Sequence, residues 1–408
     1  MVVILTMIIN RSREIHTINA VKKWILIYGR RKTGKTFTIR NFIKYDEYFF
    51  IKGDRSVLTK DEQQISYETF IELLKRALSQ NYTVVVDEFH RLGSDFFDLI
   101  HAMKKQGKLI LISSTLFLSK KLISGRSPLL GIFAEILIGL IKLQDTLRTL
   151  KQFKLPKKEM VELGILLQEP IAIDYFDESK KAREIIAIII QSSIKTIPAL
   201  IGEIFVEEER QISAVYEGVL RAVAVNKATS GEISSYLFSK RLIKKDDPSI
   251  IQQYLSNLVA FGILKRIEIY QKNKFVYKHT SPLAKIYYYI DEKYNLSERK
   301  FTIEEILPII DELVPRIVED TIREALAEIY GLRENVFEAK DYDIDGCLLK
   351  INKLEIALEV KWGKISVEDI KKTEQNMQKI DPKRKILFVQ DKAGIKFDGE
   401  VLDVGDLT

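Results

Sequence analysis

Short apolar runs alternate with amphipathic segments along the first third of the chain. Four apolar runs are each short enough for a strand and lie at residues 24–28, 48–51, 83–87 and 108–113. Three other segments carry apolar side chains at helical spacing, at residues 35–44, 66–80 and 95–106. A continuous apolar run is typical of a strand buried on both faces, and its alternation with helices predicts a parallel α/β sheet.

Helical spacing dominates the rest of the chain, except for two groups of strands. Residues 263–270 and 274–279 flank a polar turn, which is typical of a β-hairpin. A helix near residues 315–330 precedes the second group, whose strand patterns lie at about residues 347–351, 354–361 and 385–390. These changes of pattern predict four domains, at residues 1–144, 145–209, 210–295 and 296–408.

The composition indicates a folded protein with more than one core. The chain has 408 residues, of which 46% are hydrophobic, and this length exceeds what one core supports. A net charge of +7 is compatible with a polyanionic partner but does not establish one. The single cysteine, Cys347, excludes an intrachain disulfide and a cysteine-based zinc site, and it indicates a cytoplasmic protein.

No segment has the pattern of a signal peptide or a membrane span. Residues 1–9 are apolar but short and lack a basic start, so we expect a leading strand or an N-terminal arm. The apolar run at residues 129–143 is interrupted by Glu135 and is shorter than the roughly 20 residues that a span needs. We therefore expect a buried element there and no membrane contact.

The segment GRRKTGKT matches the G-x-x-x-x-G-K-[ST] phosphate loop in full, between an apolar strand and a helix. Its glycines let backbone N–H groups point at phosphate oxygens, and the helix N-terminus that follows favours negative charge. We expect Lys35 to reach the β- and γ-phosphates and Thr36 to ligate Mg²⁺. The sequence therefore predicts an ATP–Mg²⁺ site formed by Gly29, Arg30, Arg31, Lys32, Thr33, Gly34, Lys35 and Thr36.

Acidic and polar residues end the next two apolar runs. Asp87 and Glu88 end the third run, at the strand edge where open parallel sheets bind ligands. We expect Asp87 to hold Mg²⁺, directly or through water, and Glu88 to polarise the attacking water. Residues 113–115 either orient that water or form a turn. Arg126 is either an arginine finger for a neighbouring subunit's nucleotide or a surface arginine.

The order of these motifs resembles the archaeal ATPase family of the AAA+ class, in the branch related to the STAND NTPases. The motifs are RSRE at 11–14, the phosphate loop, VVVDEFHR at 84–91, LILISST at 109–115 and SGRSPL at 124–129. This resemblance covers about residues 10–290 and implies a P-loop ATPase with a helical lid. It also implies that Arg13 lies near the nucleotide base, and it leaves open a homo-oligomer or a partner protein.

Residues 210–290 resemble a winged helix-turn-helix, with the predicted hairpin as the wing. Predicted helices cover residues 212–225, 231–239 and 249–261, and the last would be the recognition helix. The wing segment carries a cluster of cations that could meet DNA phosphates, Lys265, Arg266, Lys272, Lys274 and Lys278. The alternative is a solvated hairpin in a domain that serves only intramolecular packing.

The final segment carries a second candidate site. Glu359 and Lys361 are two residues apart on a predicted strand and therefore share one face, where Asp345 of a neighbouring strand can meet them. Two carboxylates can hold a divalent metal, and a lysine can position the attacking water. The pattern resembles the PD-(D/E)xK nuclease core, which implies a metal site of Glu319, Asp345 and Glu359 with Lys361. The alternative is a salt bridge on a solvated sheet face.

These inferences predict an α/β protein with a P-loop NTPase parallel sheet, a helical lid, a winged-helix domain and a C-terminal α/β nuclease-like domain. The leading hypothesis is an ATP-binding and ATP-hydrolysing protein that acts on DNA, with a possible metal-dependent endonuclease activity. The alternative is a nucleotide-dependent STAND-like switch or scaffold, whose C-terminal regions mediate protein contacts without cutting DNA.

Overall fold

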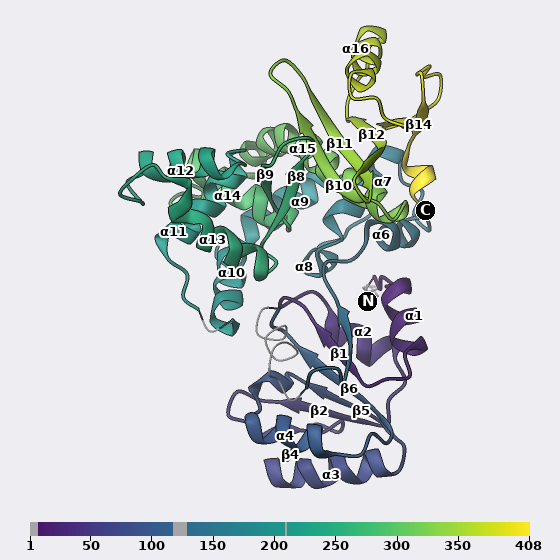
Figure 1. The fold of residues 1–408 in the computed structure, drawn as a ribbon, viewed down its shortest axis with the longest axis vertical. Helices are drawn as coiled ribbons and strands as arrows, with labels where there is room; N and C mark the ends of the chain where they lie inside the picture. Colours follow the sequence, from purple (N-terminus) through teal and green to yellow (C-terminus); the bar gives the residue numbers. More distant parts are fainter. Residues whose placement is uncertain (1–6, 117–128, 209) are drawn as a thin grey trace.

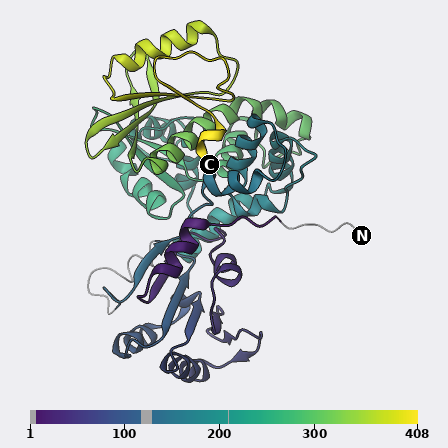
Figure 2. The same cartoon turned by 90° about the vertical axis from the view of Figure 1, so that its right-hand side faces the viewer.

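The computed structural model describes residues 7–116, 129–208 and 210–408. An N-terminal α/β part and a C-terminal part lie one above the other along the longest axis of the molecule (Figure 1). The turned view shows the helix α1, Ser12–Ala20, at the junction between the two parts (Figure 2).

Seven strands form the N-terminal sheet, in the order β4-β3-β2-β5-β6-β1-β7. The five strands from β2 to β7 in this order are parallel, and β3 and β4 continue the sheet in antiparallel pairs. The strands are β1 Ile25–Tyr28, β2 Glu47–Ile51, β3 Val57–Leu58, β4 Gln64–Ile65, β5 Thr83–Asp87, β6 Lys108–Ser113 and β7 Ala134–Leu137. All four strands predicted from apolar runs are confirmed, and β7 lies in the predicted buried run at 129–143.

Side chains that alternate along these strands pack on opposite faces of the sheet. One set packs with Phe70 and Phe96 beneath the helices α3, Tyr67–Ser79, and α4, Ser94–Ala102. The other set packs with Ile18 of α1 and Ile39 of α2, Lys35–Phe42. The sheet is therefore covered on both sides, as the continuous apolar runs predicted.

Helices connect this sheet to the C-terminal part. The first group is α6 Leu143–Leu150, α7 Lys157–Leu166, α8 Pro170–Ile173, α9 Ala182–Ser192 and α10 Thr196–Glu207. The second group is α11 Ala214–Ala224, α12 Ser230–Ser239, α13 Pro248–Ala260, α14 Pro282–Tyr294 and α15 Ile303–Ile329. The predicted helix near 315–330 is thus the second half of a longer one, because α15 begins at Ile303. The helix continues through Pro308 and Pro315.

A second sheet of seven strands joins the hairpin to the C-terminal strands, in the order β14-β13-β12-β11-β10-β8-β9. The hairpin strand β8 pairs in parallel with β10. The elements are β8 Leu264–Ile269, β9 Phe275–His279, β10 Arg333–Glu338, β11 Asp343–Lys350, β12 Lys353–Lys361, α16 Val367–Gln378, β13 Arg384–Val389 and β14 Glu400–Leu402. The domain boundaries stay predictions, but strands from both sides of residue 295 share this sheet.

No single helix in the described ranges has the length and apolar character to cross a membrane. One pair of helices among the residues that the structure describes, Ala182–Ser192 and Thr196–Val206, meets those criteria jointly, with a bend of 68° between the two helices.

Candidate nucleotide site

The phosphate loop connects β1 to α2 at the carboxyl edge of the parallel sheet. Gly34 precedes α2 with φ 84°, and Gly29 has φ 153°, so both occupy the region that favours glycine. At Gly29 a Cβ would stand 2.2 Å from the Ile138 carbonyl oxygen of the neighbouring segment. The two glycines of the motif are therefore required by backbone geometry and by close packing.

Lys35 folds back onto the loop that it belongs to. It is only 5% exposed, and its Nζ donates to the carbonyl oxygens of Gly29 at 2.9 Å and Arg30 at 2.7 Å. A buried ammonium needs such acceptors when no phosphate is present. The lysine is thus held at the place where the loop would receive phosphate groups.

Thr36 and Asp87 meet across the sheet edge. Thr36 Oγ1 donates to Asp87 Oδ2 at 2.6 Å, and the hydroxyl of Tyr48 donates to the same oxygen at 2.7 Å. Burial raises the pKa of Asp87, and these two hydrogen bonds act against that rise. A hydroxyl and a carboxylate at this separation fit a hard cation such as Mg²⁺, which takes oxygen ligands.

The carboxylate of Glu88 contacts residues that follow β5 and β6. Its φ of 59° is left-handed, and its Oε2 accepts a hydrogen bond from Ser114 Oγ at 2.8 Å. His90 Nδ1 lies 3.5 Å and Arg91 3.9 Å from the same oxygen. Ser114, one of the predicted polar residues of the strand end, thus contacts the predicted water-polarising acid directly.

A largely apolar cavity of about 180 Å³ adjoins the phosphate loop at Gly34. The side chains that line it are Met7, Ile9, Arg11, Phe37, Thr38, Ile141, Pro170, Ile173 and Asp174. Flat aromatic ligands fit apolar clefts with a few polar groups at the rim. The cavity is therefore a suitable place for a nucleotide base.

Arg11, rather than Arg13, reaches the phosphate loop. Arg11 is 2% exposed, donates to the Thr33 carbonyl oxygen, and donates to Gly139 O at 3.0 Å. Arg13 points outward from α1 and pairs with Glu328 of α15 at 2.7 Å. The expectation for Arg13 near the base is not met in this structure, because the turn of α1 directs Arg11 and Glu14 inward.

The remaining loop cations pair with acids of the connecting helices. Arg30 pairs with Glu169 at 3.2 Å, and Arg31 pairs with Glu203 at 3.2 Å. Lys32 is exposed with φ 61°, whereas Thr33 is buried. Arg126, the predicted arginine finger, lies outside the described residues. Three residues that contact this site from other elements were not identified from the sequence, namely Arg11, Tyr48 and Glu169. No sequence motif marks such residues.

The C-terminal candidates come together on the second sheet and α15. Lys361 Nζ pairs with Glu359 Oε1 at 2.6 Å, and Asp345 Oδ2 accepts from the Val360 backbone N–H at 2.8 Å. Burial raises the pKa of Asp345, and the charges of Glu359 and Glu319 raise it further. Burial and the charge of Asp320 raise the pKa of Glu319 to about 7.

These carboxylates are not arranged as a ready metal site. In the part of the chain that the structure describes, no group of three or more His, Cys, Asp and Glu side chains is placed to hold a metal ion. Glu359 is engaged by Lys361, and one oxygen of Asp345 is engaged by the backbone. The predicted metal set of Glu319, Asp345 and Glu359 would therefore need to rearrange before it could bind a cation.

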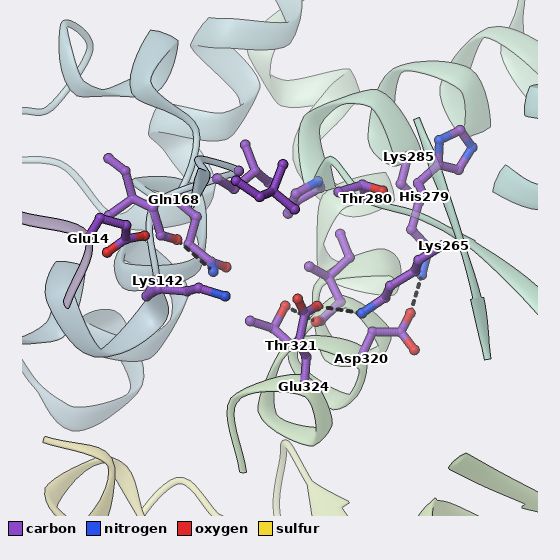
Figure 3. A pocket seen from close by; sticks show the side chains of 16 residues that line it. Glu14, Lys142, Gln168, Lys265, His279, Thr280, Lys285, Asp320, Thr321 and Glu324 are labelled. Carbon is purple, nitrogen blue, oxygen red and sulfur yellow. Dashed lines mark hydrogen bonds and ion pairs between the residues drawn. The ribbon is translucent and has the colours of Figure 1, made fainter. Parts of the chain in front are cut away.

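The predicted wing is part of the second sheet, and two of its cations form ion pairs with acids of α15. Lys265 pairs with Glu324 of α15, and Lys278 pairs with Asp320 at 3.4 Å. Figure 3 shows Lys265 and Glu324 together on the wall of a cavity of about 260 Å³ between the two parts of the molecule. Lys272 and Lys274 remain exposed at the hairpin turn. Two of the five predicted wing cations are therefore paired within the protein.

Polar side chains of the predicted recognition helix form hydrogen bonds with one another and with α11. Gln253 donates to Asn257 at 2.8 Å, and Asn257 donates to the Tyr216 hydroxyl at 2.6 Å. The order of three helices followed by a hairpin is nevertheless found as predicted, in α11, α12, α13, β8 and β9.

Comparisons with known proteins agree with the geometry of the N-terminal part. Residues 21–138 match the family described as AAA domain. No curated protein matches the chain. The Walker-type ATPase PABY2304 of Pyrococcus abyssi is similar in structure, with a TM-score of 0.50 and 19% identity over 69% of this chain and 96% of that one.

Two origin recognition proteins of Aeropyrum pernix are more distant. The ORC2 protein, in its ADPNP–ADP complexes, has a TM-score of 0.37 and 11% identity over 76% of this chain and 93% of that chain. The ORC1 protein in complex with DNA has a TM-score of 0.31 and 14% identity over 76% and 95%. Residues 21–138 of this chain thus match an AAA domain model, and the chain has a mixed α/β fold similar to that of the Pyrococcus abyssi protein.

Proposed function

We propose that the chain binds ATP with Mg²⁺ in the phosphate loop and hydrolyses it. The observation that carries this proposal is the convergence of Lys35, Thr36 and Asp87 at one edge of a parallel sheet, within an AAA domain. Lys35 would exchange two carbonyl acceptors for phosphate oxygens. Thr36 and Asp87 would hold Mg²⁺, which supplies positive charge to the phosphates when it is bound.

Glu88 would act as the general base in hydrolysis. Ser114 donates to its Oε2, and the carboxylate keeps further acceptor sites for a proton from the attacking water. Lys35 would stabilise the charge that develops on the phosphoryl oxygens. The hydrogen bond from Ser114 would orient the carboxylate of Glu88 during this step.

Equilibrium binding of ATP to the full chain, with and without Mg²⁺, tests this function, with phosphate release as the second readout. We expect binding in both conditions and phosphate release only with Mg²⁺. A chain that binds no ATP at concentrations up to the millimolar range would reject the proposal.

We further propose that the C-terminal part binds DNA through the α12–α13 turn and the hairpin tip. Both lie on exposed surface, in contrast to the two wing cations that are paired with α15. The exposed cations at these places are Arg241, Lys244, Lys245, Lys272 and Lys274. The alternative is a nucleotide-dependent switch or scaffold, in which these surfaces contact proteins instead.

Duplex binding should weaken steeply with salt. Four lysines that each neutralise a phosphate give a slope of about −3 to −4 in a plot of log affinity against log salt concentration. Replacing Lys244, Lys245, Lys272 and Lys274 with alanine should flatten that slope, whereas alanine at the exposed Lys75 and Lys104 of the AAA domain should not. A flat profile for the wild-type chain would favour the scaffold.

A second candidate function is metal-dependent DNA nicking at the C-terminal cluster. The observation that favours it is the shared environment of Glu319, Asp345, Glu359 and Lys361, in which burial raises the pKa of all three acids and the charges of Glu359 and Glu319 raise the pKa of Asp345 further. Metal ligands must be deprotonated. Any nicking should therefore increase as the pH rises from 6 to 8, through the pKa of Glu319 at about 7.

Nicking of supercoiled plasmid with Mn²⁺ or Mg²⁺ tests this second candidate. Glu359→Ala with Lys361→Ala should abolish nicking and leave ATP hydrolysis intact. The control is Glu355→Ala with Lys353→Ala, which changes the same face of β12 outside the cluster. Equal nicking by the wild type and the cluster variant would assign the activity elsewhere.

A further inference from the structure

The phosphate loop is connected to the C-terminal part through one buried carboxylate. Glu169 Oε2 accepts from Arg30 of the loop at 3.2 Å, and its Oε1 accepts a hydrogen bond from Ser281 Oγ. The side chains of Arg30 and Glu169 are 11% and 8% exposed, and Ser281 is 6% exposed. Three residues that are far apart in the sequence thus form one buried chain of polar contacts.

One end of this connection contacts Lys35 of the phosphate loop, and the other end caps α14. The Arg30 carbonyl oxygen accepts from Lys35 Nζ at 2.7 Å and from Thr33 Oγ1 at 3.0 Å. Ser281 is the N-cap of α14, and its Oγ accepts from the Ala284 backbone N–H at 3.1 Å. Glu169 itself is the N-cap of α8, whose Pro170 lines the cavity next to Gly34.

Phosphate binding must disturb this arrangement at the Arg30 end. Lys35 has three N–H donors, so donating to both the β- and the γ-phosphate requires it to release at least one of its two carbonyl acceptors. When the released acceptor is the carbonyl of Arg30, that backbone unit loses a charged donor, and the side chain of the same arginine holds Glu169. A cavity of about 40 Å³ borders Arg30, Glu169 and Ser281.

We propose that Arg30, Glu169 and Ser281 form a relay that carries the nucleotide state of the phosphate loop to the N-terminus of α14. This inference rests on the proposed ATP binding and adds the route by which that binding reaches the C-terminal part. In the arrangement described above, Glu169 holds Ser281 in its capping position. When nucleotide withdraws Lys35 from Arg30, the contact with Glu169 weakens and the cap of α14 loosens.

The pair of Arg31 with Glu203 provides a matched control. Its distance is also 3.2 Å, but the two side chains are 35% and 48% exposed. Exposed ion pairs contribute little and are screened by water. Glu203 lies on α10 and pairs with the neighbouring loop residue Arg31. Its replacement therefore measures a general loss of attraction between the loop and the helices, separately from loss of the relay.

Hydrogen exchange of the full chain, with and without a non-hydrolysable ATP analogue and Mg²⁺, tests the relay. In the wild type the analogue should raise the exchange rate of the Ala284 amide about fivefold, which is the equilibrium factor for one N-cap hydrogen bond. Glu169→Gln should remove this response while analogue binding, measured separately, is retained. Glu203→Gln should respond as the wild type does.

Ser281→Ala provides a second test of the relay if Glu169→Gln folds poorly. Its Ala284 amide should exchange fast without nucleotide and respond no further when the analogue binds. The relay is overturned if Glu169→Gln keeps the wild-type response, or if the wild type binds the analogue with no change at Ala284. A wild type that binds no analogue overturns the proposed function as well, and the separate binding measurement identifies that outcome.

Discussion

Lys35→Ala is expected to lower the affinity for ATP about 100-fold, because it removes a charge-assisted contact worth about 3 kcal/mol. The same change leaves the carbonyl oxygens of Gly29 and Arg30 without their ammonium donor. The contact with Gly29 is buried, so its carbonyl oxygen would lack a partner at a cost of about 1 to 3 kcal/mol. We therefore expect loss of binding together with a lower unfolding temperature.

Titration of ATP into the purified chain, together with a thermal unfolding curve, measures both effects. The control is Lys44→Ala, which removes an exposed lysine just beyond the end of α2. Unchanged ATP affinity in Lys35→Ala would contradict the assignment of the phosphate loop. A large loss in the control would show that the net charge near α2, rather than one ammonium, determines affinity.

Glu88→Gln is expected to lower the rate of ATP hydrolysis about 100-fold or more while nucleotide binding is retained, since a general base contributes a factor of about 10² to 10⁴. The amide can still accept the hydrogen bond from Ser114, so the local fold should persist. It cannot take a proton from water. The variant should therefore accumulate the ATP-bound state.

Phosphate release under saturating ATP is the measurement, with ATP binding determined in parallel. Glu72→Gln on the exposed side of α3 is the matched control and should hydrolyse ATP as the wild type does. An unchanged rate in Glu88→Gln would mean that another group polarises the water. His90 would then be the next candidate, because it lies 3.5 Å from the same carboxylate.

Sequence patterns predicted the parts of the fold that depend on local periodicity. The strands β1, β2, β5 and β6 follow directly from apolar runs that only a doubly covered sheet can bury. The meeting of Thr36 with Asp87 follows from topology, because Asp87 ends the parallel strand β5 and Thr36 lies in the first turn of α2, which follows the parallel strand β1. These features are properties of short segments or of a simple sheet order.

Tertiary pairing was beyond the reach of the sequence. Nothing in the residues around Tyr48 indicates that its hydroxyl reaches Asp87, since that contact depends on β2 lying beside β5. The charge cluster of the wing predicted free cations, but α15 supplies Asp320 and Glu324 as partners from a distant part of the chain. Arg11 likewise acquires its contacts only when α1 packs against the loop.

The parallel pairing of β8 with β10 has a consequence for dissecting the protein into fragments. Cutting the chain near residue 295 would leave β8 and β10 each with an unpaired edge. Exposed strand edges template intermolecular pairing and promote aggregation. A fragment that keeps residues 210–408 together retains this pairing, so solubility of the halves is a poor guide to whether each half performs a function of its own.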